Sequence, residues 1–222
     1  MGMSANARGA ARQDRRVVRS RRAIVQAFEQ LLAERPLDKI TVSAIAQRAD
    51  VDRKTFYQHY GSISGLLDAI AWDFAARVLD EVERTCAANG RTDAAPEMLH
   101  AFFRALAGNL SANMARERGF FEHVPTEVLY ERLRAPFERQ IVDRGLIAGI
   151  IADDIREPAL AFVLGGMLAL MRDWLEDGDT RAIDDVVSLA CALTERGLAG
   201  IALGDGDETT GSALMSERSG VS

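Results

Sequence analysis

The chain has 222 residues, of which 48% are hydrophobic and 27% are charged, a balance that excludes a wholly disordered protein. Its longest uncharged apolar run, Ala159 to Met171, is shorter than the roughly 18 residues that a membrane span needs, so we expect no contact with a membrane. The two cysteines form no disulfide framework, and the N-terminus lacks the apolar stretch of a signal peptide. These features favour a globular protein of the reducing cytoplasm.

The net charge of −6 argues at first against a nucleic-acid ligand, because a polyanion repels an acidic protein. The charge is unevenly distributed, however. Residues 1–60 carry 12 basic and 6 acidic side chains, a net of +6, whereas residues 61–222 carry 15 basic and 27 acidic ones, a net of −12. A basic segment joined to an acidic one indicates contact with nucleic acid or a membrane surface.

Apolar residues recur at helical spacing along almost the whole chain. They predict a first helix from Ser20 to Glu34, two short helices over about 42–49 and 53–60, and a long fourth helix from Ile63 to about Asn89. Thr41 and Asp52 are placed to cap the two short helices.

Further helices are expected at about 96–117, 125–144, 157–177 and 182–202. Prolines stand in their expected first turns and glycines where they are expected to stop: Pro96, Pro125, Pro158, Gly119, Gly145 and Gly178. A strand over Gly145 to Ile151 is the less favoured alternative to a buried helical turn. We therefore predict an all-α fold of about nine helices.

The two short helices, joined by Asp50-Val51-Asp52, predict a helix-turn-helix whose second helix can lie in a DNA major groove. Phe56 and Tyr60 are four residues apart and are expected to pack inward. The outward residues of the second helix are of the types that contact phosphates and base edges: Arg53, Lys54, Thr55, Tyr57, Gln58 and His59.

The stretch ITVSAIAQRADVDRKTFYQHYGSISGLLDAI, Ile40 to Ile70, resembles the tetracycline-repressor (TetR) family of bacterial transcription regulators. The resemblance is carried by a Thr-initiated helix, an Ile-Ala pair, a turn with a buried Val, and the run Thr-Phe-Tyr-x-His-Tyr. It implies that Thr41 and Ser43 meet the DNA backbone. It also implies that Arg53, Lys54, Thr55 and Gln58 face bases or adjacent phosphates, while Tyr57 and His59 contact phosphates.

The sequence departs from that family pattern at two positions. Asp50 stands where many relatives carry Gly, and Asp tolerates the left-handed backbone conformation better than most residues, so we expect the turn to survive. Ile63 stands where many relatives carry a phosphate-binding Lys, so one contact is lost. The basic N-terminal segment is expected to compensate, because Arg15, Arg16 and Arg19 are spaced with Arg22 to share a helix face.

The predicted organisation has four parts: a disordered basic arm over 1–15, a helix-turn-helix domain over 16–76, a ligand-binding and dimerisation domain over 77–203, and a disordered tail over 204–222. The helices at about 157–177 and 182–203 have wide apolar faces, more than one packing partner would cover. In the family the last two helices form a four-helix dimer interface, so the resemblance implies a homodimer that reads a palindromic operator. The alternative is that these helices only build the monomer core.

The central helices supply the aromatic, Met and His side chains expected around an apolar pocket for an unknown small-molecule effector. The candidate ligand-binding residues are Phe74, His100, Phe103, Phe121, His123, Tyr130, Phe137, Met167, Met171 and Trp174. Taken singly, each of these residues is better explained as part of the hydrophobic core, and only the group as a whole favours a pocket. The histidines and cysteines lack metal-site spacing, so neither a metal nor another cofactor is expected.

No sequence motif of a known catalytic site is present, so we expect no enzyme. The sequence favours a ligand-responsive repressor that binds double-stranded operator DNA as a homodimer. The alternative is a ligand- or protein-binding co-regulator that keeps this fold but acts through a partner protein.

Overall fold

In the computed structural model the described residues are 3–88, 95–147, 153–177 and 181–202, and they form helices and no strand. A short 3-10 helix, Leu37–Lys39, lies between the first two α-helices. The nine α-helices of the described residues are α1 Met3–Leu32, α2 Val42–Arg48, α3 Arg53–Tyr60, α4 Ile63–Ala88, α5 Ala95–Ala112, α6 Met114–His123, α7 Thr126–Asp143, α8 Asp153–Glu176 and α9 Ile183–Ala202. The predicted all-α fold is confirmed.

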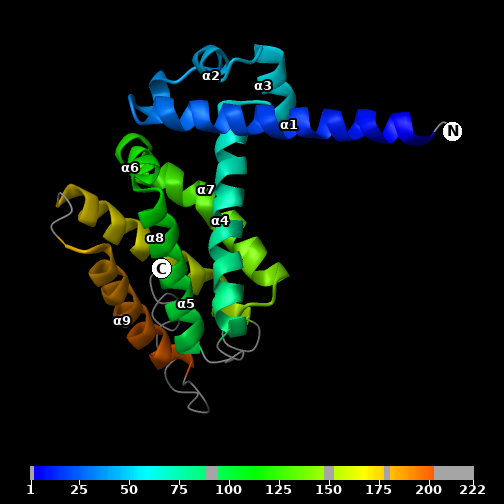
Figure 1. The fold of residues 1–222 in the computed structure, drawn as a ribbon. Helices are drawn as coiled ribbons and strands as arrows, with labels where there is room; N and C mark the ends of the chain where they lie inside the picture. Colours follow the sequence, from blue (N-terminus) through cyan, green and yellow to red (C-terminus); the bar gives the residue numbers. More distant parts are fainter. Residues whose placement is uncertain (1–2, 89–94, 148–152, 178–180, 203–222) are drawn as a thin grey trace, which may run out of the picture.

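Helices α1, α2 and α3, residues 3–62, form a head at one end of the molecule, and α1 lies across the upper end of α4 (Figure 1). Phe28 of α1, Ile45 of α2 and Phe56 of α3 are fully buried and meet Leu66 at the start of α4. These side chains come from all four helices, so their burial fixes α2 and α3 on α1 and joins the head to α4.

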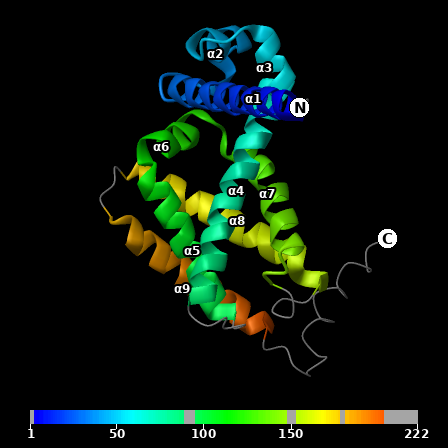
Figure 2. The ribbon, with the colours of Figure 1, turned by 45° about the vertical axis from the view of Figure 1, so that its right-hand side comes forward.

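Helices α4 to α9 form the body. Helix α4 runs from the head into the body, where it packs against α5 and α7, while α8 and α9 pack against each other (Figure 2). The body core contains Val78, Phe103, Phe137, Met171 and Trp174. Helix α4 therefore contributes to both cores, with Leu66 and Leu67 in that of the head and Phe74 and Val78 in that of the body.

The first helix is longer than the sequence pattern predicts. It begins at Met3 rather than near Ser20, and so includes most of the segment for which we expected a disordered arm. Residues 3–19 contain several Ala and Arg residues, which are strong helix formers, and no proline. The helix can therefore extend without an apolar stripe, and its N-terminal part projects beyond the rest of the molecule in Figure 1.

The helix expected over 96–117 is two helices, and Gly119 does not end either of them. The first break is at Asn113, whose backbone leaves the helical region (φ −132°, ψ 29°) and whose side-chain amide donates to the carbonyl of Asn109. Asn competes with the helix backbone in this way. Gly119 lies inside α6 instead, and a Cβ there would be 3.3 Å from the backbone nitrogen of Ala33. The glycine permits a close approach of α6 to the end of α1.

Helix α8 also begins earlier than predicted, at Asp153, which places Pro158 in its second turn. By length and composition alone, the stretch Asp154–Glu176 could span a membrane, contrary to our expectation from uncharged runs, but a core helix of a soluble protein passes the same test. Only 28% of that stretch is buried within the chain.

The expected tail over 204–222 lies outside the described residues. So does most of Gly145 to Ile151, the stretch for which a strand was the alternative prediction. Gly145, the start of that stretch, adopts a positive φ of 65° just after α7. This conformation costs glycine little, and it ends α7 where the sequence predicts.

Candidate nucleic-acid interface and ligand cavity

Three polar residues shape the helix-turn-helix: one caps each helix, and one turns the chain between them. Thr41 caps α2, with its hydroxyl oxygen accepting from the backbone N–H of Ala44 at 3.2 Å, and Asp52 caps α3, accepting from the N–H of Thr55 at 2.6 Å. Asp50 between them has a φ of +53°. The expectation that Asp50 occupies the left-handed region is therefore confirmed, and both predicted caps are present.

The outer face of α3 is exposed along the length of the helix. Phe56 is fully buried beneath α3, while 53% of Tyr57 is exposed. Arg53, Lys54 and Gln58 are also exposed, and Thr55 is half-buried. The helix therefore presents one basic and polar face outward, in the arrangement that its sequence predicts.

The first turn of α2 lies beside this face. Thr41 and Ser43 are exposed, and a guanidinium nitrogen of Arg53 is 3.5 Å from the hydroxyl oxygen of Ser43. The start of α2 and the start of α3 thus form one continuous surface at the end of the molecule opposite the body (Figure 1).

His59 differs from the other residues on this helix because its ring is half-buried against α1. Its Nε2 is 2.8 Å from the hydroxyl oxygen of Ser20, whose own hydrogen is donated to the carbonyl of Val17. The imidazole must then be the donor to Ser20. Burial, followed by the charge of Arg21, lowers the pKa of His59. A neutral ring that holds α3 on α1 is the primary role that this geometry supports.

Tyr60 makes a second connection between α3 and α1. Its hydroxyl donates to the carbonyl of Arg21 at 3.3 Å, and the guanidinium of Arg21 lies 5.6 Å from the centre of its ring. Tyr60 is half-buried, as its predicted inward position requires.

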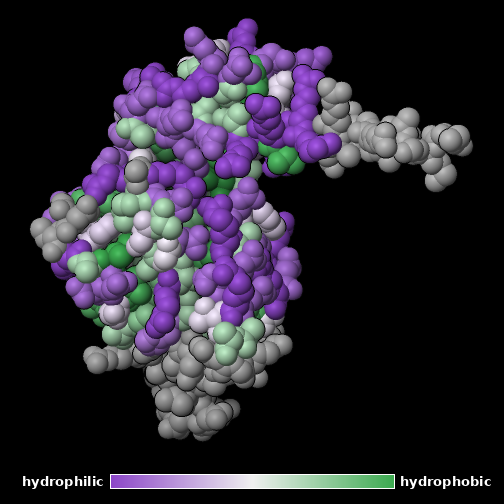
Figure 3. Space-filling model, viewed as in Figure 1, coloured by the Kyte–Doolittle hydropathy of each residue, from purple (hydrophilic) through white to green (hydrophobic). Residues whose placement is uncertain are grey.

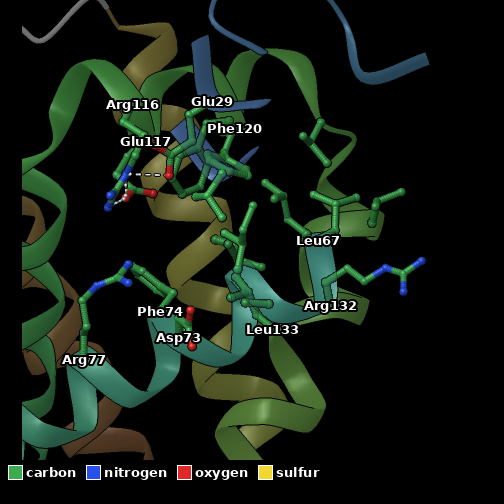
Figure 4. A pocket seen from close by; sticks show the side chains of 18 residues that line it. Glu29, Leu67, Asp73, Phe74, Arg77, Arg116, Glu117, Phe120, Arg132 and Leu133 are labelled. Atoms are coloured by element: carbon green, nitrogen blue, oxygen red, sulfur yellow. Dashed lines mark hydrogen bonds and ion pairs between the residues drawn. The ribbon is translucent and has the colours of Figure 1, made fainter. Parts of the chain in front are cut away.

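A cavity of about 140 Å³ lies where the head meets the body. Side chains from α1, α4, α6, α7 and α8 line it, and the lining is mainly apolar, with Leu67, Ile70, Phe74, Phe120, Leu133 and Leu168 (Figure 4). A smaller cavity of about 30 Å³, with a wholly apolar lining, lies deeper in the body and shares Phe74, Phe121, Leu133 and Leu168 with the first.

Charged side chains lie at one end of the larger cavity. Arg116 of α6 reaches between Glu117 of the same helix, at 2.5 Å, and Glu29 of α1, at 3.7 Å (Figure 4). Arg77 extends from α4 on the same side. Burial raises the pKa of Glu29, although the charge of Arg116 opposes that shift, and burial lowers the pKa of Arg77.

The predicted ligand-binding residues are distributed over several environments. Phe74 and Phe121 line both cavities, and Phe137, Met167 and Met171 line the smaller one. The others lie elsewhere: Phe103 is buried in the core, His100 is exposed, and Tyr130 and His123 are half-buried.

Trp174, the last of the predicted ligand-binding residues, lines neither of these two cavities. Its ring is buried, and its indole N–H donates to the carbonyl of Arg181 at 2.7 Å, which joins the end of α8 to the segment before α9.

The sequence analysis did not identify the charged residues at one end of the larger cavity, among them Glu29, Arg77, Arg116 and Glu117. Nothing in their spacing sets them apart from charged residues on a solvated helix face. They come from three helices, and only the packing of α1 on α4 and α6 brings them together.

Exposed apolar residues lie on the two helices predicted to form a dimer. The exposed fractions are 63% for Phe162 of α8, 42% for Leu189 and 57% for Leu193 of α9. Figure 3 shows hydrophobic patches on the flank of the body where Figure 1 draws α8 and α9.

Comparison with known proteins places the head in a known family. Residues 24–70 match the model of the bacterial regulatory proteins of the tetR family. The uncharacterized HTH-type transcriptional regulator YxbF of Bacillus subtilis is 39% identical over 70 residues, which cover 31% of this chain and only 18% of that relative.

Solved structures share the fold of both head and body. The fatty acid degradation regulator FadR from Bacillus halodurans has a TM-score of 0.57 at 17% identity, with 79% of this chain and 94% of that chain covered. The repressor FadR from Thermus thermophilus, solved in complex with lauroyl-CoA, has a TM-score of 0.54 at 20% identity, with 78% and 92% covered. Residues 24–70 of the head therefore carry the sequence pattern of the tetR family of bacterial regulatory proteins, and the head and body together have the fold of these solved structures.

Proposed function

We propose that this transcriptional regulator is a cytoplasmic, ligand-responsive repressor that binds a palindromic DNA operator as a homodimer. The observation that carries the proposal is the exposed face of α3, where Arg53, Lys54, Tyr57 and Gln58 stand outward beside Thr41 and Ser43. Such side chains hydrogen-bond base edges and phosphates when a helix lies in the major groove.

The charge distribution supports the same orientation on DNA. Residues 1–60 have a net charge of +6 and the remainder −12, so the head is attracted to the phosphates while the body is repelled. In a twofold dimer, the two basic heads would lie at one end and the two acidic bodies at the other.

The dimer is proposed to form through α8 and α9. Phe162, Leu189 and Leu193 are large apolar side chains that remain exposed on these helices, and α8 is only 28% buried over its apolar stretch. A second copy would cover these faces. A twofold axis between the copies would place the two α3 helices on half-sites about one helical turn apart.

A small-molecule effector is proposed to weaken operator binding by changing the separation of the two heads. The cavity at the junction of head and body is a suitable site, since α4 passes along it into the head. Among proteins of similar fold, the FadR of Thermus thermophilus has been solved with lauroyl-CoA. A complete switch of such an equilibrium requires about 10⁴-fold tighter effector binding to one state.

Retention of DNA fragments from beside the protein's own gene tests the proposal. The wild-type chain should retain a specific fragment in a salt-sensitive manner, and Lys54→Ala together with Tyr57→Ala should weaken retention at least about tenfold. Lys39→Ala is the matched control, because Lys39 is an exposed lysine of the head outside α3 that pairs with Asp38.

Unchanged retention in the double variant would show that α3 does not read DNA. Absence of retention by the wild-type chain, with capture of a regulatory protein, would favour the co-regulator alternative.

Ile63 is half-buried among the apolar side chains of the head, so its side chain supplies no phosphate contact at the start of α4.

A further inference from the structure

The size and lining of the cavity between head and body indicate the apolar part of its ligand. Its volume is about 140 Å³, and Leu67, Phe74, Phe120 and Leu133 form apolar walls. An engineered apolar cavity of roughly 150 Å³ accepts a benzene ring. One aromatic ring is therefore the size of group that this cavity holds.

The carboxylate of Glu29, at the polar end of this cavity, has no hydrogen-bond donor among the described residues, although its side chain is only 17% exposed. Arg116 lies 3.7 Å away, beyond hydrogen-bond distance. The guanidinium of Arg116 instead donates from Nε and a terminal nitrogen to Glu117, at 3.0 and 2.5 Å. A carboxylate removed from water normally has a donor, so Glu29 is an acceptor that a ligand can satisfy.

The pKa of Glu29 agrees with this geometry. Burial raises that pKa, and the charge of Arg116, which acts in the opposite direction, does not cancel the rise. A ligand that donated a hydrogen bond to the carboxylate would lower the pKa again, because such a bond favours the charged form.

The charges of the lining disfavour a charged ligand of either sign. At the polar end three carboxylates face two guanidiniums, those of Glu29, Asp73, Glu117, Arg77 and Arg116. Arg132, the other charged residue of the lining, is paired with Asp68 at 2.6 Å. An anion would therefore add to an acidic majority, and an ammonium group at Glu29 would lie beside the guanidinium of Arg116. A neutral polar group avoids both repulsions.

The same end of the cavity also offers hydrogen-bond donors. Arg77 forms no hydrogen bond or ion pair with any of the described residues, and its guanidinium carbon lies 5.8 Å from the centre of the Phe74 ring. A hydroxyl group donates one hydrogen bond and accepts others, whereas a carbonyl group only accepts. A hydroxyl is therefore the neutral group that suits an end with both an acceptor and donors.

We propose that the cavity binds a small neutral phenol, with its ring against Phe74 and Leu133 and its hydroxyl donating to Glu29. This ligand class rests on the proposed function only in being the effector of that repressor. The binding site itself is argued from the cavity and the carboxylate of Glu29. Because Glu29 belongs to α1 and the ring would contact α4 and α7, the ligand would touch head and body at once.

Calorimetric titration of the full chain in the absence of DNA tests the ligand class. Phenol should bind once per chain. Toluene, in which a methyl group replaces the hydroxyl, should bind at least about fivefold more weakly, because it leaves Glu29 without a donor. Benzoate and benzylamine, which carry a negative and a positive charge on the same ring, should bind at least about tenfold more weakly than phenol. The proposal is overturned if any of the three binds as tightly as phenol, or if phenol shows no binding at millimolar concentration.

Variants of Glu29 test the hydrogen bond itself. Glu29→Leu removes the acceptor and should abolish the preference for phenol over toluene, whereas the loss of a purely structural Glu29 would change both affinities by the same factor. Glu29→Gln keeps a carbonyl acceptor and should retain part of the preference. Glu131→Gln, at an exposed glutamate of α7 outside the cavity, should leave both affinities unchanged.

Circular dichroism melting of each variant verifies folding. An undiminished preference for phenol in Glu29→Leu, or in Glu29→Gln where the leucine variant does not fold, would overturn the assignment of Glu29 as the acceptor.

The readouts separate this inference from the proposed function. Calorimetry uses no DNA, so a failure to bind phenol leaves the retention of operator fragments untouched, and a failure of retention leaves the calorimetry untouched. Where both succeed, phenol should reduce operator retention by the wild-type chain. Retention that is insensitive to saturating phenol would overturn the role of this ligand class as the effector.

Discussion

Asp50 determines how α3 is set relative to α2. Its φ of +53° turns the chain, and the next residue, Val51, donates its N–H to the carbonyl of Ala46 at 3.0 Å. A β-branched residue is strained in this region of backbone space, whereas glycine adopts it freely.

Asp50→Val should therefore lower the free energy of unfolding by about 1–2 kcal/mol, and Asp50→Gly should leave it within about 0.5 kcal/mol. Urea denaturation of both variants measures the difference. Equal stabilities of the Val and Gly variants would mean that the left-handed conformation carries no constraint.

The ring of His59 links stability to pH. Burial and the charge of Arg21 lower its pKa below the ordinary value of 6.5, so the unfolded chain binds the proton more readily. The contribution of the neutral ring is complete above that value and is lost as the pH falls toward the lowered pKa.

When the pH is lowered from about 7.5 to about 5.5, the free energy of unfolding should thus decrease more for the wild-type chain than for His59→Gln. His100→Gln is the control, since His100 is exposed on α5 and should leave the wild-type pH dependence intact. The same decrease in the wild type and in His59→Gln would contradict this role.

At the scale of elements, α1 combines two properties. Its C-terminal part is held by buried Ile24, Phe28 and Leu31, whereas Arg19 and Arg22 are exposed three residues apart near the middle of the helix. A helix holds such a pair in a fixed relation, so both can approach one DNA backbone.

Arg19→Ala and Arg22→Ala should each reduce the slope of log binding constant against log salt by about 0.9, the value for one phosphate contact. The measurement is operator affinity over a series of salt concentrations. Arg84→Ala, in the body and paired with Glu81, should leave the slope unchanged. A weaker affinity with an unaltered slope would exclude phosphate contact by these arginines.

At the scale of the whole molecule, the exposed apolar face of α8 and α9 determines the proposed assembly. A twofold interface contains every residue twice, so one charged substitution introduces two charges into it. Phe162→Glu or Leu193→Glu should convert the dimer into a monomer at micromolar concentration, as measured by analytical ultracentrifugation.

Val142→Glu is the matched control for that experiment. Val142 is 49% exposed on α7, so the substitution adds the same charge outside the proposed interface. A wild-type chain that sediments as a monomer, or interface variants that remain dimeric, would contradict the arrangement through α8 and α9.

The sequence by itself determined the helix-turn-helix, because its signals are local. Thr41 and Asp52 each accept a hydrogen bond from the backbone N–H three residues further along the chain, and Asp50 adopts its turn conformation next to the bond from Val51 to Ala46. The start of α2 and both ends of α3 therefore agree with the prediction. The boundary errors arose where a local signal had another use, as at Gly119, which serves the approach of α6 to α1.

Only the tertiary structure decided where the charged cluster of Glu29, Arg77, Arg116 and Glu117 lies. Each of these residues stands on an ordinary amphipathic helix, and its spacing fits a solvated face. The packing of α1, α4 and α6 brings together side chains up to 88 positions apart in the chain, from Glu29 to Glu117. Burial at this junction depends on which helices pack together, and the residue pattern within a single helix does not predict its packing partners.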